Sequence, residues 1–127
     1  MEPAAAVTLP ATVHAPAQAR RHLQDVGGAW PERVLDAALL VVSEAVTNAL
    51  RHGSGAIELC VAVGDGRIRL EVSDEGGGLP RRRPTADDDL GEGGRGLYLL
   101  DALTTGWGTE HRTDRPGKTV WMEIPRS

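Results

Sequence analysis

Aromatic side chains are scarce in this sequence, which contains no Phe, one Tyr and three Trp. A hydrophobic core must therefore be built mainly from Val, Leu, Ile and Ala. The hydrophobic fraction of 40% is nevertheless ordinary for a globular protein. A chain of 127 residues has the usual length of one domain and can bury a two-layer core. We therefore expect a single domain over residues 1–127.

Cysteine is almost absent, since Cys60 is the one cysteine of the chain. A lone cysteine excludes an internal disulfide framework and is typical of a reducing compartment. No apolar run approaches the roughly 20 residues that a membrane-spanning helix needs. The first residues also lack the basic segment and the apolar core of a signal peptide. These absences predict a cytoplasmic protein with no membrane partner.

A basic surplus is lacking as well, because the formal net charge is −4. Nucleic-acid-binding proteins usually carry such a surplus, so we expect no direct nucleic-acid partner. The basic run at residues 81–83 and the acidic run at residues 87–89 roughly cancel each other. His14, His22 and His111 share no metal-ligand spacing and are predicted to be surface residues.

One long amphipathic helix is predicted between Pro31, which suits a first helical turn, and Gly53, which suits the position after a helix. Glu44, Asn48 and His52 follow one another at steps of four, so they project together from one side of this helix. We place them opposite the apolar stripe and interpret them as ligand-binding residues. The apolar stripe consists of Leu35, Ala38, Leu39, Val42, Val46, Ala49 and Leu50.

A change to period two after this helix predicts strands. Apolar and polar residues alternate over residues 57–63 and 68–72, with the hairpin signal Gly64-Asp65-Gly66 between them. Alternation returns at residues 119–124, and residues 107–112 and 4–9 are expected to add strands. Shorter helices are predicted from Ala17 to Val26 and from Leu97 to Leu103. The pattern predicts an α+β two-layer sandwich, a mixed but mostly antiparallel sheet with helices on one face.

Two glycine-rich segments follow the hairpin. Asp74 stands at the end of a strand and is followed by glycines at residues 76–78, which let a ligand approach the backbone closely. An Asx-type turn would leave the same pattern. The second segment spans residues 91–97 and leads into a helix, where backbone N–H groups can bind phosphate. A dinucleotide-binding fold is not expected, because Pro80 and Pro84 exclude the upstream strand that its glycine pattern needs.

In this order, Glu44-x-x-x-Asn48, Asp74-x-Gly76-x-Gly78 and Gly91-x-Gly93-x-x-Gly96-Leu97 resemble the N, G1 and G2 boxes of the GHKL nucleotide-binding superfamily. The superfamily includes gyrase B, MutL and the ATPase domains of histidine kinases, whose architecture is the Bergerat fold. The boxes fall at residues 44–52, 74–78 and 91–97, with an ATP lid at residues 79–94. The chain is most similar to the stand-alone bacterial anti-sigma-factor serine kinases.

The resemblance implies a role for each matching position. Asn48 would be the protein's Mg²⁺ ligand, and Glu44 would accept the proton of an attacking hydroxyl. Asp74 would accept a hydrogen bond from the adenine amine, with Thr119 supporting it through water. His52 would contact phosphate, although a helix-end cation is an equally good interpretation. The other nucleotide-binding positions would be Gly76, Gly78, Gly91, Gly93, Gly94, Arg95, Gly96 and Leu97.

The implied activity is ATP-dependent phosphorylation of a Ser on an anti-anti-sigma partner of the STAS type, by a kinase that also binds a sigma factor. The cofactors would be ATP and Mg²⁺. The protein would regulate transcription and could assemble as a homodimer. One alternative is a non-catalytic module that binds ATP and sequesters a regulatory partner. Another is a detached sensor-kinase ATPase domain that phosphorylates a His on a separate protein. A complete histidine kinase is not expected, because no phosphoacceptor helices precede the domain.

Overall fold

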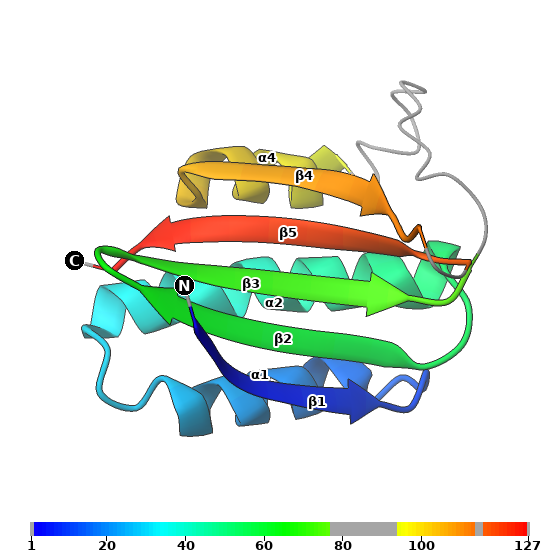
Figure 1. The fold of residues 1–127 in the computed structure, drawn as a ribbon, viewed down its shortest axis with the longest axis horizontal. Coiled ribbons are helices and arrows are strands. Elements are labelled where there is room, and N and C mark those ends of the chain that lie inside the picture. The colour runs from blue at the N-terminus through cyan, green and yellow to red at the C-terminus, as the bar shows by residue number, and fades with distance from the viewer. Residues whose placement is uncertain (1, 77–93, 114–115, 127) are drawn as a thin grey trace.

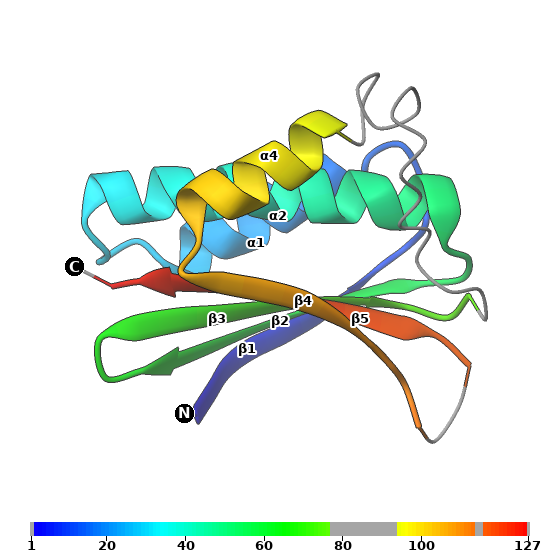
Figure 2. The same cartoon turned by 90° about the horizontal axis from the view of Figure 1, so that it is seen from above.

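Two layers make up the computed structural model, which describes residues 2–76, 94–113 and 116–126. Three helices cover one face of a five-stranded sheet, whose strand order is β1-β2-β3-β5-β4 (Figures 1 and 2). The elements are β1 (Glu2–Leu9), α1 (Ala15–Val26), α2 (Glu32–His52), β2 (Ile57–Gly64), β3 (Arg67–Asp74), α4 (Gly94–Leu103), β4 (Gly106–His111) and β5 (Lys118–Pro125). The predicted α+β sandwich is confirmed. Every pairing between the described strands is antiparallel, so this part of the sheet is not mixed.

The β2–β3 hairpin forms where the sequence predicts it. Gly64 pairs with Arg67 across a loop of two residues, and Gly66 has a φ of 78°. A positive φ at this position is a feature of the turns that match the twist of two antiparallel strands, and glycine adopts it without steric cost. The turn fixes the register, which brings Ile68, Leu70 and Val72 to the same buried face.

Several element ends differ from the prediction. The first helix begins at Ala15 rather than Ala17, with Pro16 in its first turn, where the missing N–H costs nothing. Helix α4 begins at Gly94, three residues before the predicted start at Leu97. The segment around Val13 was predicted to contribute to an edge strand together with residues 4–9. Val13 is instead 84% exposed and lies in the turn before α1. The edge strand itself begins at Glu2.

Helix α2 packs its apolar side onto the sheet, but this side is rotated relative to the predicted stripe. Leu35, Leu39 and Leu50 are only partly buried. Glu44 and Asn48 are half-buried and His52 is exposed, so the polar trio runs along the border of the buried side rather than opposite it. Small residues bring α2 close to the sheet and to α1. The residues of α2 that are buried are Val34, Ala38, Val41, Val42, Ala45, Val46 and Ala49.

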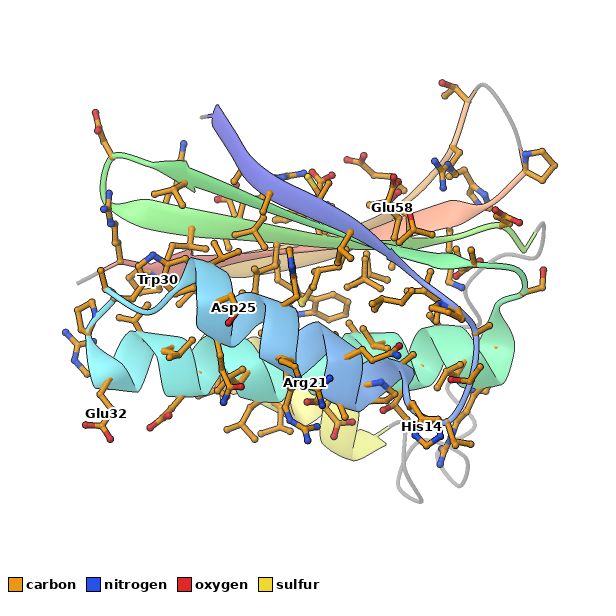
Figure 3. The ribbon with its side chains drawn as sticks, turned by 90° about the horizontal axis from the view of Figure 1, so that it is seen from below. His14, Arg21, Asp25, Trp30, Glu32 and Glu58 are labelled. Atoms are coloured by element: carbon orange, nitrogen blue, oxygen red, sulfur yellow. The ribbon has the colours of Figure 1, made fainter. Side chains whose placement is uncertain are left out.

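Each of the three Trp side chains makes a contact within the protein. Trp30 and Trp107 pack against the core, and Figure 3 shows Trp30 at the α1–α2 connection beside the sheet. Trp107 Nε1 also donates to Asp101 Oδ1 at 2.7 Å, which ties β4 to α4. Trp121 belongs to the other face of the sheet, where the guanidinium carbon of Arg69 lies 4.7 Å from its ring centroid.

The core predicts a large difference between two leucine truncations. Leu59 of β2 is fully buried, whereas Leu40 of α2 is 50% exposed. We expect Leu59→Ala to lower the free energy of unfolding by about 2–5 kcal/mol, because it leaves a cavity in a packed core. Leu40→Ala, the matched control, should change it by about 0.5 kcal/mol or less. Urea denaturation followed by circular dichroism measures both, and equal losses would contradict the assigned core.

Candidate functional site

A buried carboxylate lies at the end of β3. Asp74 is only 2% exposed, and both of its oxygens accept hydrogen bonds. Oδ1 accepts from the backbone N–H of Gly76 at 2.8 Å, and Oδ2 accepts from Lys118 Nζ at 2.7 Å. Such short contacts to an ionised group are strong and directional. They fix the orientation of the carboxylate and leave each oxygen with further acceptor capacity.

Glycine residues of three segments pack closely around Asp74. A Cβ atom at Gly53, the residue after α2, would lie 2.5 Å from the Asp74 Cγ atom. A Cβ atom at Gly76 would lie 3.2 Å from Asp74 Oδ1. Gly117 has a φ of 132° and would crowd the Asp74 carbonyl if it carried a Cβ atom. The glycines therefore allow a close approach of the main chain, which a larger residue would prevent.

The end of β3 is also joined to the end of α2. The backbone N–H of Glu75 donates to the carbonyl of Ser54 at 2.9 Å. Glu44, Asn48 and His52 occupy the last turns of α2, immediately before Gly53. At about 1.5 Å per residue, Asn48 lies about 7 Å and Glu44 about 13 Å along the helix from Gly53. The polar trio thus forms a line that leads away from Asp74.

The structure does not bring Thr119 to this site. Thr119 pairs with Ser73 across β3 and β5, and their hydroxyl oxygens lie 2.7 Å apart. Successive residues of a strand point to opposite faces, so this pair lies on the face opposite Asp74. The role in adenine recognition that the resemblance implies for Thr119 stays a prediction, and the pairing of Thr119 with Ser73 does not support it.

Lys118 is the residue that sequence reasoning missed. It is the direct cross-strand partner of Asp74, and its side chain is only 10% exposed. The signal was available in the alternation of β5. Met122 and Ile124 point into the core, and the same parity places Lys118 on the face that carries Asp74.

The glycine-rich segment is described only in part. Gly78, Gly91 and Gly93 lie outside the described residues, as does nearly all of the predicted lid at residues 79–94. Gly94, Arg95, Gly96 and Leu97 form the first turn of α4 rather than a loop before it. The first N–H groups of a helix have no partner within that helix, so the backbone of this turn can bind an anion. Helix α4 packs against α2, which carries the polar trio.

The described residues contain no cluster of three or more His, Cys, Asp or Glu side chains that could hold a metal ion. Asn48 of α2 carries a carboxamide oxygen, which is a type of ligand that Mg²⁺ accepts alongside water and phosphate oxygens. Among the described helices, none has the length and hydropathy that a bilayer crossing requires.

The other histidines and the cysteine differ in how deeply they are buried. His14 and His111 are exposed as predicted, but His22 is half-buried and its Nε2 atom has no partner among the described residues, so its surface assignment is wrong. Burial, together with the charges of Glu71 and Glu58, raises the pKa of the Cys60 thiol. Cys60 therefore stays protonated at neutral pH and is a poor nucleophile.

A second surface feature lies apart from Asp74, between α1 and α2. Arg20 Nη1 donates to Ser43 Oγ at 3.3 Å across this groove. Leu40 adds the exposed apolar side chain of the groove. Figure 3 views this side of the molecule and shows Arg21 and Asp25 along α1. The residues that line the groove are Arg20, Asp36, Leu39, Leu40 and Ser43.

Known proteins share this sequence pattern. The chain is 34% identical to the anti-sigma F factor of Geobacillus stearothermophilus over 94 residues, which is 65% of this chain and 64% of that protein. It is 36% identical to the serine-protein kinase RsbW of Staphylococcus epidermidis over 80 residues, half of each chain. The chain thus spans between half and two thirds of the length of these curated relatives.

Solved structures share the fold. The histidine kinase domain of the blue-light activated histidine kinase from Erythrobacter litoralis EL346 superimposes with a TM-score of 0.57. The similarity covers 92% of this chain and 61% of that one at 22% identity. The family described as "Histidine kinase-like ATPase domain" matches residues 9–124, nearly the whole chain. The sheet and the helical layer of this chain agree with this match, and the chain belongs to the histidine kinase-like ATPase domain family.

Proposed function

We propose that this protein binds ATP with the adenine base at Asp74 and the phosphates along the last turns of α2. The observation that carries the proposal is the buried Asp74 carboxylate, which is held at the point where β3 and α2 meet. An oriented acceptor enclosed by glycine backbone suits a flat base with an exocyclic amine. The polar line of α2 and the first turn of α4 then supply groups for the phosphates and Mg²⁺.

The residue types present fit this ligand. Asn48 offers a carboxamide oxygen, which is a hard ligand suited to Mg²⁺. Glu44 lies one helical turn further and offers a carboxylate where the end of a triphosphate would reach. Bound Mg²⁺ would neutralise phosphate charge, while the protein positions the groups. The predicted roles of Gly76, Arg95 and His52 in nucleotide binding belong to the same proposal.

We further propose that the protein transfers the γ-phosphate to a protein serine. The serine hydroxyl oxygen bonds to the γ-phosphorus, and Glu44 accepts the hydroxyl proton. The bond to the β–γ bridging oxygen breaks and ADP leaves. Relatives named anti-sigma F factor and serine-protein kinase RsbW support this activity. The acceptor would be a STAS-type anti-anti-sigma protein, and the second partner would be a sigma factor. The protein would act as a homodimer in the cytoplasm.

The nucleotide site predicts a selective loss in one aspartate variant. We expect Asp74→Asn to weaken ATP binding by about 1–3 kcal/mol, because the amide replaces an acceptor with a donor toward the adenine amine. Asp65→Asn is the matched control, since Asp65 is exposed in the β2–β3 turn. Isothermal titration calorimetry with ATP and Mg²⁺ measures both affinities. Equal affinities of the Asp74→Asn variant and the wild type would refute the adenine assignment.

The transfer step predicts a different defect. Glu44→Gln should slow phosphotransfer from γ-labelled ATP to the cognate STAS partner by about 10²–10⁴-fold, because the amide cannot accept the proton. Its ATP affinity should stay close to that of the wild type. Glu32→Gln, in the exposed first turn of the same helix, is the control.

Two outcomes of this assay would contradict the kinase. Wild-type protein that binds ATP but labels no partner would indicate the non-catalytic binding module. An acid-labile label on the acceptor would indicate histidine phosphorylation by a detached sensor-kinase domain.

A further inference from the structure

Lys118 and Asp74 form a buried ion pair on the helix-covered face of the sheet. Lys118 Nζ lies 2.7 Å from Asp74 Oδ2, and the two side chains are 10% and 3% exposed. They are direct cross-strand partners at the ends of β5 and β3, so the backbone register holds them together. The backbone of Gly53 presses against the carboxylate from the side of α2. The geometry of the pair is therefore set by main chain on three elements.

Stability alone explains this pair poorly. Removing two charges from water costs several kcal/mol per ion, and their attraction often does no more than offset that cost. Val72 and Val120, the next cross-strand pair on the same face of the sheet, show that this face accepts apolar partners. A charged pair beside the ligand position is better explained by an interaction with the ligand.

The donors and acceptors of the pair can be counted. An ammonium group has three N–H donors, and Asp74 Oδ2 accepts one of them. Within the part of the chain that the structure describes, Asp74 is the hydrogen-bond partner found for Lys118 Nζ. The pair thus presents a donor directly beside an acceptor. Adenine presents the complementary arrangement, because its 6-amino donor is adjacent to the ring N1 acceptor.

The geometry points to Lys118 as a second base-reading residue, which donates to adenine N1 while Asp74 accepts from the 6-amino group. This inference rests on the proposed ATP site and deepens it. Lys118 also holds Asp74 in one orientation, because the ammonium and the Gly76 N–H bind different oxygens of the carboxylate. The assignment gives the chain a charged reader at the position where the sequence predicted the hydroxyl of Thr119.

A nucleotide that lacks only N1 tests the assignment. We compare ATP with 1-deaza-ATP, in which N1 is replaced by C–H and the 6-amino group is retained, by calorimetry in the presence of Mg²⁺. The wild type should bind ATP at least about tenfold more tightly, which corresponds to one hydrogen bond from a charged donor. Lys118→Met should bring the ratio of the two affinities close to one, and Lys118→Arg should restore part of the preference.

The ratio of the ATP and 1-deaza-ATP affinities distinguishes a loss of adenine N1 recognition from a loss of folded protein. A variant that is partly unfolded loses affinity for both nucleotides equally, so its ratio keeps the wild-type value. Arg67→Met, which removes an exposed cation at the other end of β3, is the control and should keep the wild-type ratio. Lys118→Gln retains an N–H donor for Asp74 and serves as a second variant if Lys118→Met does not fold.

Each result has one meaning. A wild-type ratio near one, or an unchanged ratio in folded Lys118→Met, would overturn the role of Lys118 while leaving ATP binding intact. A wild type that binds neither nucleotide would instead overturn the proposed function.

Discussion

The hydrogen bonds of the Asp74 carboxylate join three elements that are far apart in sequence. One oxygen binds the turn after β3, the other binds Lys118 at the start of β5, and the group rests against Gly53 at the end of α2. The site therefore depends on the sheet register and on the approach of α2 at the same time. A shift of one residue in the β3–β5 pairing would turn Lys118 away from Asp74 and bring Thr119 in its place.

The fold was predictable from the sequence because local signals agreed with one another. Alternation over β2, β3 and β5, the Asp65-Gly66 turn and the long apolar periodicity of α2 all predicted one α+β sandwich. Element ends were less predictable. Helix α4 includes Gly94 and Gly96, which are weak helix formers, so packing against α2 rather than intrinsic propensity extends this helix.

The candidate site was predictable in part. Glu44 and Asn48 could be grouped from their spacing, since a step of four aligns side chains on any helix. Their position at the border of the buried side could not be predicted, because it depends on how α2 is rotated against the sheet. Lys118 was missed for a different reason. A lysine at the start of a strand usually points to solvent, whereas the alternation of β5 places Lys118 on the buried face, where it pairs with Asp74.

The central claim is that a nucleotide binds where β3, β5 and the end of α2 meet. The most direct measurement is a two-dimensional ¹H–¹⁵N NMR titration of the protein with ATP and Mg²⁺. The account predicts that the largest amide shift changes occur at Gly53, Gly76 and Lys118, with further changes along the last turns of α2. Shift changes confined to the groove around Leu40 between α1 and α2, or none at all, would contradict it.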